Sequence, residues 1–386
     1  MKQKTLFLIT FLLILNSFNG EAQKKITMGA EQFELYLPLL KNKNVALMVN
    51  PSSTIGNTHL VDTLRALGVN IKKIFSPEHG FRGTADAGEK VKSDVDAKTG
   101  ILVTSLYGDN KKPTKDQLND IDIIIFDLQD VGTRFFTYIS SMHYLMQASA
   151  DYNKKIIILD RPNPNGNYID GPVLEMKYKS FVGMHPIPIV HGLTVGELAQ
   201  MINGEKWLDS NKICDLVVIP MKNYDHTSTY SLPVKPSPNL PNDISIRLYP
   251  SLCLFEGTII SVGRGTEFPF QQLGAPKKEY GKYKFTPKSM PGAKKPPYEN
   301  QVCYGIDLRK STNKGGINLS YLIELYSKSP EKEKFFIPFF TKLSGNTVLQ
   351  EQLKKGIKEA EIKKTWQPEL EKYRIKRKKY LLYKDF

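Results

Sequence analysis

The chain has 386 residues, of which 40% are hydrophobic and 24% are charged, and its formal net charge is +15. This composition is typical of a globular protein with room for two domains, and it excludes an intrinsically disordered chain. The positive charge favours an anionic partner, although a solvated, lysine-rich surface explains it equally well. Nucleic acid is disfavoured as the partner because the sequence contains no motif of a nucleic-acid-binding fold.

The first 22 residues have the pattern of a secretory signal peptide. Lys2 and Lys4 precede an apolar run over residues 6–15, and small and polar residues follow up to a plausible cleavage site at Ala22. The apolar run is too short to span a membrane, and no later segment reaches the length of a spanning helix. We therefore expect export to the periplasm or the medium, with no integral membrane segment after signal removal.

After residue 22 the sequence alternates between buried strands and helices. Continuous apolar runs predict strands at residues 44–49, 71–75, 101–106, 121–126 and 155–159. The segments between and before them predict helices at residues 33–40, 59–67, 113–118 and 135–150. This alternation indicates an α/β domain over residues 23–182 with a Rossmann-like, doubly wound, mostly parallel sheet.

From about residue 183 prolines become frequent and the regular alternation is lost. We expect a smaller α+β domain over residues 183–386. One helix is well marked in it, because Thr194 and Glu197 form a capping box in front of an apolar run. Further strands are predicted at residues 216–219 and 259–262, and further helices at residues 317–326 and 345–360.

Polar clusters follow nearly every predicted strand of the first domain. They lie at Asn50, at residues 76–82, at Tyr107, at residues 127–130 and at residues 160–163. Sheets of this class bind ligands outside the carboxyl ends of their strands, so we expect the functional site there. No glycine-rich dinucleotide motif follows the first strand and no P-loop motif occurs, which disfavours a nucleotide. We expect no cofactor.

Two carboxylates in different environments are the usual minimum for glycoside hydrolysis. Glu78 is the first candidate, because it lies in a loop of titratable residues directly after a buried strand. The second carboxylate stays open, and the candidates are Asp127, Asp130 and Glu256, with Asp160 and Glu267 behind them.

Other side chains of the polar clusters are candidates for binding. Arg264 lies between two glycines, and this flexible backbone suits a guanidinium that binds a carboxylate of a ligand. The alternative is that Arg264 forms a surface salt bridge without a role in binding. Asn239 lies in a proline-bounded loop, where its amide could bind an acetamido or hydroxyl group. The histidines and acidic residues lack the spacing typical of metal ligands, so we expect no metal. The three cysteines, Cys214, Cys253 and Cys303, are odd in number and widely spaced, which predicts buried free thiols.

Several motifs stand in order along the chain: SPEHGFRG at residues 76–83, DLQDVGTRFFTY at 127–138, LDRPNP at 159–164, HGLT at 191–194, SPN at 237–239, and EGT with GRGT at 256–258 and 263–266. Together they resemble the exo-β-N-acetylmuramidases of the NamZ type, a glycoside hydrolase family formerly known as a domain of unknown function. The resemblance covers almost all of the chain after the signal. It implies a Rossmann-like domain, a smaller second domain and a site in the cleft between them.

The resemblance also implies an activity: release of terminal N-acetylmuramic acid from the non-reducing end of peptidoglycan fragments, with Glu78 as the catalytic glutamate. We expect Glu78 to be the general acid and a carboxylate among Asp127, Asp130 and Glu256 to assist it. The lactyl carboxylate of this anionic amino sugar suits Arg264, Arg134 or Arg82 as a clamp. One departure from the family pattern is Ile259, where Asn is expected. We expect the substrate-binding residues to be His79, Arg82, Asp130, Arg134, Tyr138, Arg161, Asn163, His191, Asn239 and Arg264.

Two other functions stay open at this point. A non-catalytic periplasmic protein could use the same cleft only to bind muropeptides. A metal-dependent hydrolase could act there on a peptide or ester bond.

Overall fold

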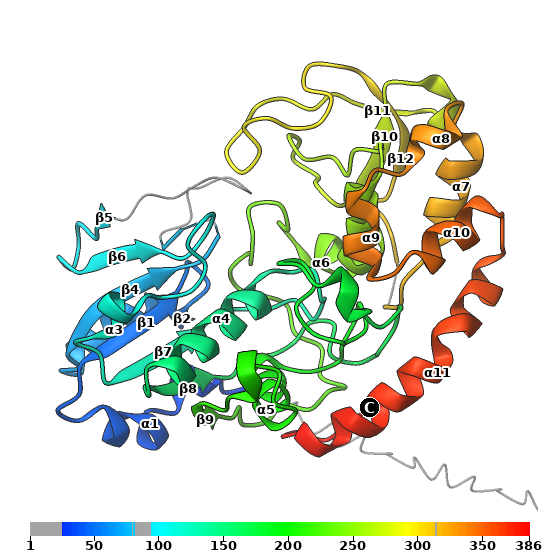
Figure 1. Cartoon of the computed structure of the whole chain (residues 1–386). Coiled ribbons are helices and arrows are strands. Elements are labelled where there is room, and N and C mark those ends of the chain that lie inside the picture. Colours follow the sequence, from blue (N-terminus) through cyan, green and yellow to red (C-terminus); the bar gives the residue numbers. More distant parts are fainter. Residues whose placement is uncertain (1–24, 79, 82–93, 313–314) are drawn as a thin grey trace, which may run out of the picture.

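The computed structural model describes residues 25–78, 80–81, 94–312 and 315–386, and the predicted signal peptide lies outside them. One lobe contains a large, mostly parallel sheet covered by helices, and a second, smaller lobe contains a short antiparallel sheet with its own helices (Figure 1). This arrangement confirms the predicted fold class. Over the described ranges, no helix is both long and apolar enough to cross a membrane.

The large sheet has seven strands in the order β5-β6-β4-β1-β7-β8-β9, and every neighbouring pair is parallel except β5 and β6. The central strand is β1, whose Leu47 pairs with Ile74 of β4 and Ile125 of β7. The edge strand β9 follows residue 182, so the sheet takes one strand from the part of the chain assigned to the second domain. The bounds are β1 (Val45–Val49), β4 (Ile71–Ser76), β5 (Asp94–Val95), β6 (Leu102–Ser105), β7 (Ile123–Asp127), β8 (Lys155–Leu159) and β9 (Asp215–Ile219).

The strands of this sheet are apolar without interruption because both faces are buried. Alternate residues of β1 belong to two different cores: Val45, Leu47 and Val49 face one side, and Ala46 and Met48 face the other. The first side is covered by α1 (Phe33–Leu40) and α2 (Leu60–Ala66), and the second by α4 (Tyr138–Asp151) and α5 (Val195–Gly204). This sandwich fixes the carboxyl ends of the parallel strands along one edge.

The second lobe has an antiparallel sheet in the order β10-β12-β11. Its elements are β10 (Gln272–Ala275), β11 (Tyr283–Phe285), β12 (Cys303–Asp307), α6 (Asp243–Leu252), α7 (Ser320–Lys328), α8 (Lys332–Phe335), α9 (Phe339–Ser344), α10 (Val348–Lys354) and α11 (Glu359–Arg377). The other short elements with sheet or α-helical geometry are β2 (Thr54–Ile55), β3 (Thr58–His59) and α3 (Lys115–Leu118). The predicted strand at residues 259–262 is wrong: Ile259 donates to Phe335, whereas Ser261 bridges Gly274, so the segment follows no single partner.

Arg134 connects the two lobes from inside the core, where its side chain is fully buried. Its Nη1 donates to the carbonyls of Pro172 and Ile187, both at 2.8 Å. Its Nη2 donates to the carbonyls of Leu343 and Ser344, both at 2.9 Å. These last two residues end α9, where helix carbonyls lack intrahelical partners and carry partial negative charge. Burial lowers the pKa of Arg134 to about 9.

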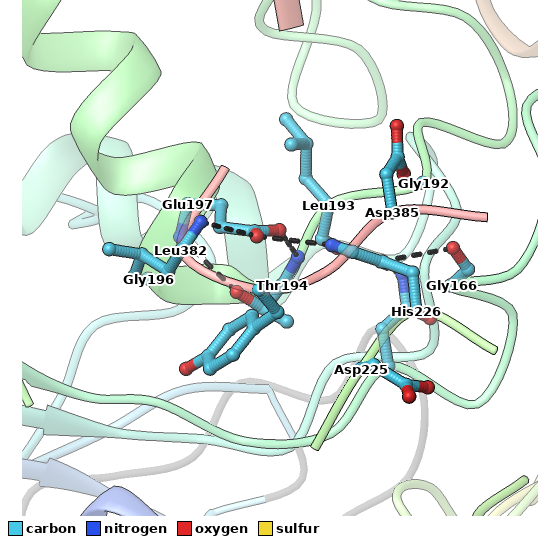
Figure 2. A network of polar contacts seen from close by, with 12 residues as sticks. Gly166, Gly192, Leu193, Thr194, Gly196, Glu197, Asp225, His226, Leu382 and Asp385 are labelled. Carbon is cyan, nitrogen blue, oxygen red and sulfur yellow. Dashed lines mark hydrogen bonds and ion pairs between the residues drawn. The ribbon is translucent and has the colours of Figure 1, made fainter. Parts of the chain in front are cut away.

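The C-terminal segment makes a second connection, because α11 runs from the small lobe back to the large one (Figure 1). Beyond it, the Leu382 amide donates to Glu197 Oε1 at 2.9 Å, and His226 Nε2 lies 3.0 Å from the same oxygen (Figure 2). Glu197 Oε2 accepts the Thr194 amide at 2.9 Å, which confirms the predicted capping box of α5. Arg377 donates from Nε to the Gly192 carbonyl at 2.9 Å.

A pair of buried histidines lies between α4 and the loop that covers it. His143 Nδ1 and His185 Nε2 are 3.0 Å apart. Burial, assisted by the charge of Lys179, lowers the pKa of His143 to about 4. Burial and the neighbouring His143 lower the pKa of His185 well below its usual value. Both rings are therefore neutral in the native protein at neutral pH.

Replacing Arg134 by methionine should lower the free energy of unfolding by about 3–5 kcal/mol, because four buried carbonyls lose the donors of a charged group. Urea denaturation followed by circular dichroism measures this change. The control is Arg309→Met, which removes an arginine from an exposed pair with Asp307 and should leave the unfolding midpoint near that of the wild type. An Arg134→Met protein as stable as the control would contradict the interlobe role.

Acid should destabilise the protein through the histidine pair. Between pH 6.5 and about 4, His143 is protonated in the unfolded chain but stays neutral in the native protein. The free energy of unfolding therefore decreases by about 1.4 kcal/mol per pH unit for this residue. Urea titrations across this range should give a shallower pH slope for His143→Gln than for the wild type. Equal slopes would show that the histidine titrates normally.

Candidate active site

A pocket of about 160 Å³ lies where the carboxyl edge of the large sheet meets the second lobe. Both halves of the chain contribute to it. Its described lining consists of Glu78, Tyr107, Phe135, Phe136, Thr137, Tyr138, Phe181, Val182, Ser237, Asn239, Leu240, Tyr249, Glu256, Arg264 and Phe270. The pocket therefore brings together three carboxylate or guanidinium groups within an otherwise aromatic and uncharged wall.

Glu78 follows β4 by two residues and presents its half-buried carboxylate to the pocket. Its Oε1 accepts a hydrogen bond from the Tyr107 hydroxyl at 2.9 Å, and its Oε2 accepts one from Thr137 Oγ1 at 3.1 Å. Tyr107 follows β6, the neighbour of β4, and Thr137 immediately precedes α4. Three separate segments meet at this carboxylate because parallel strands end at the same edge of a sheet.

Tyr138, the first residue of α4, connects the strand edge to the loop that forms the next wall. Its hydroxyl accepts from Asn50 Nδ2 at 2.9 Å and donates to the Pro236 carbonyl at 3.2 Å. Burial, and then the charge of Glu78, raise the pKa of Tyr138, so it remains a neutral donor. On the same loop, Asn239 donates from Nδ2 to the Gly292 carbonyl at 2.9 Å.

The far wall carries an ion pair from the second lobe. Arg264 Nε donates to Glu256 Oε1 at 2.6 Å, and the guanidinium carbon lies 5.2 Å from the centre of the Phe270 ring. Glu256 Oε2 accepts from Cys253 Sγ at 3.6 Å. Burial opposes the charge of Arg264, but Glu256 more than offsets it, and the pKa of Arg264 is raised. Arg264 therefore stays charged in the pocket wall.

Asp127 lies outside the described lining of this pocket. It ends β7, and both its oxygens are held by Arg161: Nε to Oδ1 at 2.5 Å and Nη2 to Oδ2 at 2.8 Å. Both side chains are almost fully buried. Burial opposes the charge of Arg161, but Asp127 more than offsets it, and the pKa of Arg161 is raised. This bidentate pair joins the ends of two neighbouring strands behind the pocket.

Other predicted site residues also lie behind the pocket, where they hold loops. Asp130 Oδ2 accepts the Gly132 amide at 2.6 Å and lies 3.6 Å from His191 Nε2. Asn163 Nδ2 donates to the Leu193 carbonyl at 2.8 Å. Arg134 binds the four carbonyls described above. The structure thus brings Glu78, Tyr138, Asn239, Glu256 and Arg264 together and leaves Asp127, Asp130, Arg134, Arg161, Asn163 and His191 outside the described lining.

His79 and Arg82 lie outside the residues that the structure describes. Sequence reasoning missed Tyr107 and Thr137, the two donors to Glu78. The sequence offered only weak signals for them, since Tyr107 belongs to a polar cluster after a strand and Thr137 belongs to a motif. Only the fold shows that both donate to Glu78. The aromatic residues Phe136, Phe181, Tyr249 and Phe270 were also missed, because apolar residues of a pocket look like core residues in a sequence.

In the described segments, no group of three or more histidine, cysteine, aspartate or glutamate residues could hold a metal ion. Cys214, Cys253 and Cys303 are buried and free, as predicted. Burial raises the pKa of the Cys214 and Cys303 thiols to about 12. Burial also raises the pKa of Cys253 well above its usual value, so none of the three thiols is activated as a nucleophile.

Comparisons with known proteins match the chain over nearly its full length. The family model described as "Exo-beta-N-acetylmuramidase NamZ, N-terminal" matches residues 45–244, and the corresponding C-terminal model matches residues 247–383. The peptidoglycan β-N-acetylmuramidase NamZ of Bacillus subtilis is 39% identical over 373 residues, covering 90% of this chain and 89% of that protein.

Two crystal structures of DUF1343 family proteins from Bacteroides fragilis have the same fold. The first is 50% identical with a TM-score of 0.88, covering 94% of this chain and 100% of the other. The second is 30% identical with a TM-score of 0.79, covering 93% of this chain and 99% of the other.

Proposed function

The chain belongs to the NamZ family of exo-β-N-acetylmuramidases, and on that premise we propose that it releases terminal N-acetylmuramic acid from the non-reducing end of peptidoglycan fragments. It is a glycoside hydrolase. The observation that carries the proposal is the position of Glu78, a carboxylate that reaches the pocket between the two lobes and is oriented by two hydroxyl donors.

Glu78 acts as the general acid that protonates the leaving glycosidic oxygen. Such a group must lie within hydrogen-bond reach of the substrate and keep a fixed orientation. Tyr107 and Thr137 each hold a different oxygen of the carboxylate, so the side chain cannot rotate without losing a hydrogen bond. The aromatic lining around it limits water, which strengthens electrostatic interactions in the pocket.

Family membership favours the hydrolase over a non-catalytic muropeptide-binding protein. The binding protein would need the same pocket but no oriented acid. A metal-dependent hydrolase is disfavoured because the described lining of the pocket contains only Glu78 and Glu256 as acidic residues and includes no histidine or cysteine. The positive net charge of the chain agrees with an anionic substrate.

Export is the second part of the proposal, supported by the pattern of residues 1–22. An enzyme that degrades peptidoglycan meets its substrate outside the cytoplasmic membrane. The signal pattern has a charged start, an apolar run and small residues before Ala22.

Glu78→Gln should lower kcat for release of N-acetylmuramic acid from a chromogenic N-acetylmuraminide by about 10²–10⁴-fold, the usual contribution of a general acid. Glutamine has nearly the same shape as glutamate and keeps one of its two oxygens, so the melting temperature should change little. The matched control is Glu267→Gln, which removes an exposed carboxylate outside the described lining and should leave kcat near that of the wild type.

Two results would contradict this assignment. Retention of most activity by Glu78→Gln would remove Glu78 from the chemistry. Calorimetric binding of N-acetylmuramic acid by the wild type, without product release over long incubation, would favour the binding protein instead.

Export predicts the start of the mature chain. When the full sequence is expressed in a Gram-negative host, the protein recovered from the periplasm should lack residues 1–22, because signal peptidase cleaves after small residues. Intact mass spectrometry measures this directly, and a charged substitution in the apolar run should retain the uncleaved chain in the cytoplasm. A periplasmic protein with the intact N-terminus would contradict cleavage at Ala22.

A further inference from the structure

Arg264 is the one cationic side chain in the described lining of the pocket. The two other arginines of the motif clusters that the structure describes are occupied elsewhere: Arg134 by four carbonyls and Arg161 by both oxygens of Asp127. A negatively charged group on the substrate would therefore meet Arg264 among the described residues.

The guanidinium of Arg264 has a donor to spare. A guanidinium carries five N–H donors, and a carboxylate can accept two of them in parallel. Glu256 takes the Nε donor at 2.6 Å, whereas Nη1 has no hydrogen-bond partner among the described residues. The face of the group lies over Phe270, and the buried Nη1 is the donor that a second carboxylate would satisfy.

The backbone around Arg264 is built to hold the group in this position. Gly263 and Gly265 have φ angles of +80° and +82°, which other residues rarely adopt. Added Cβ atoms there would lie 2.6 Å from Gln272 and 2.5 Å from Pro296. Phe270, whose ring supports the guanidinium, also has a positive φ of 55°, a strained value for a bulky residue. Strain of this kind is found at ligand-binding sites.

Glu256 is held in the same arrangement, and its charge is paired with the guanidinium of Arg264. Its Oε1 accepts from Arg264 and its Oε2 accepts from Cys253. Glu78 accepts hydrogen bonds from the hydroxyl groups of Tyr107 and Thr137, and a hydroxyl can exchange such a bond for one to a substrate.

From these observations we propose that Arg264 recognises the lactyl carboxylate of N-acetylmuramic acid through its Nη edge, and that Glu256 is a positioning residue that orients Arg264. This inference rests on the proposed function. It makes the pocket selective for the muramic acid unit, because N-acetylglucosamine has the same ring and acetamido group but lacks the lactyl carboxylate.

The test compares chromogenic β-glycosides of N-acetylmuramic acid and N-acetylglucosamine. Arg264→Met keeps the length of the side chain, and the ratio of kcat/KM for the two glycosides should fall by about 10- to 100-fold, since a charge-assisted hydrogen-bonded pair is lost. Arg264→Lys keeps the positive charge but lacks the paired N–H donors of a guanidinium, so it should give an intermediate ratio of kcat/KM. If kcat/KM fell by the same factor for both glycosides, the proposal would be overturned.

The matched control is Arg309→Met. Arg309 also pairs with a carboxylate, at 2.8 Å from Asp307, and also lies over an aromatic ring, 5.0 Å from the centre of Phe268. It is outside the described lining of the pocket, so its removal should leave the ratio unchanged. If the two arginine variants changed the ratio equally, a general loss of positive charge would explain the effect and the proposal would fail.

The role of Glu256 is tested by how KM and kcat respond. Glu256→Gln should raise KM for the muraminide about tenfold and leave kcat within a few-fold, because the arginine loses its orientation but the acid remains. Glu256→Asp should partly restore KM, and the pH profile of kcat should keep the limbs of the wild type. A collapse of kcat in Glu256→Gln with unchanged KM would show a catalytic carboxylate instead.

Binding without turnover provides a second measurement. In the Glu78→Gln background, calorimetry with free N-acetylmuramic acid should show affinity that Arg264→Met reduces about 10-fold or more. Equal affinity with and without Arg264 would overturn the proposal. Absence of muramic acid release by the wild type is a different outcome, since it would contradict the proposed function itself.

Discussion

The buried guanidinium of Arg134 is the interaction on which the cleft depends. Its donors end on carbonyls of both lobes, so each lobe holds the other at one distance and orientation. Thr137 and Tyr138, which line the pocket, follow Arg134 by three and four residues. Burying a charge without an acidic partner is costly, and the lowered pKa of Arg134, about 9, reflects that cost. A displaced second lobe would leave the charge unsolvated, which disfavours alternative arrangements.

The C-terminal segment adds a second polar connection at the N-terminal end of α5. Glu197 accepts from Thr194, His226 and Leu382, and Tyr383 donates to Asp160 at 2.5 Å (Figure 2 shows the Glu197 contacts). Burial raises the pKa of Asp160 to about 6. The two lobes are therefore joined by buried hydrogen bonds of defined geometry in addition to apolar packing. Such contacts specify one position, because an unpaired buried polar group is expensive.

Continuous apolar runs predicted the strands β1, β4, β7 and β8 within one or two residues, because a strand buried on both faces must be apolar throughout. They could not predict that β9 joins the same sheet, since strand pairing is decided by contacts between distant segments. The segment at residues 259–262 has a strand-like composition, but its backbone bonds to two different partners. The sequence suggested that Arg134 binds the substrate, because nothing local reveals the four carbonyls from elsewhere in the chain that it binds.

The roles of the acidic residues in the candidate site could not be predicted from the sequence either. Both Asp127 and Glu256 are acidic residues near an arginine of a motif, and the sequence alone could not rank them. In the structure the Asp127–Arg161 pair is bidentate, with 0% and 3% of the two side chains exposed, and Arg161 donates further to Met28 and Thr54. In the Glu256–Arg264 pair, 24% and 21% are exposed, and one guanidinium nitrogen has no partner among the described residues. A satisfied buried pair gains nothing from a ligand, whereas a pair with a spare donor beside a pocket can bind a further carboxylate.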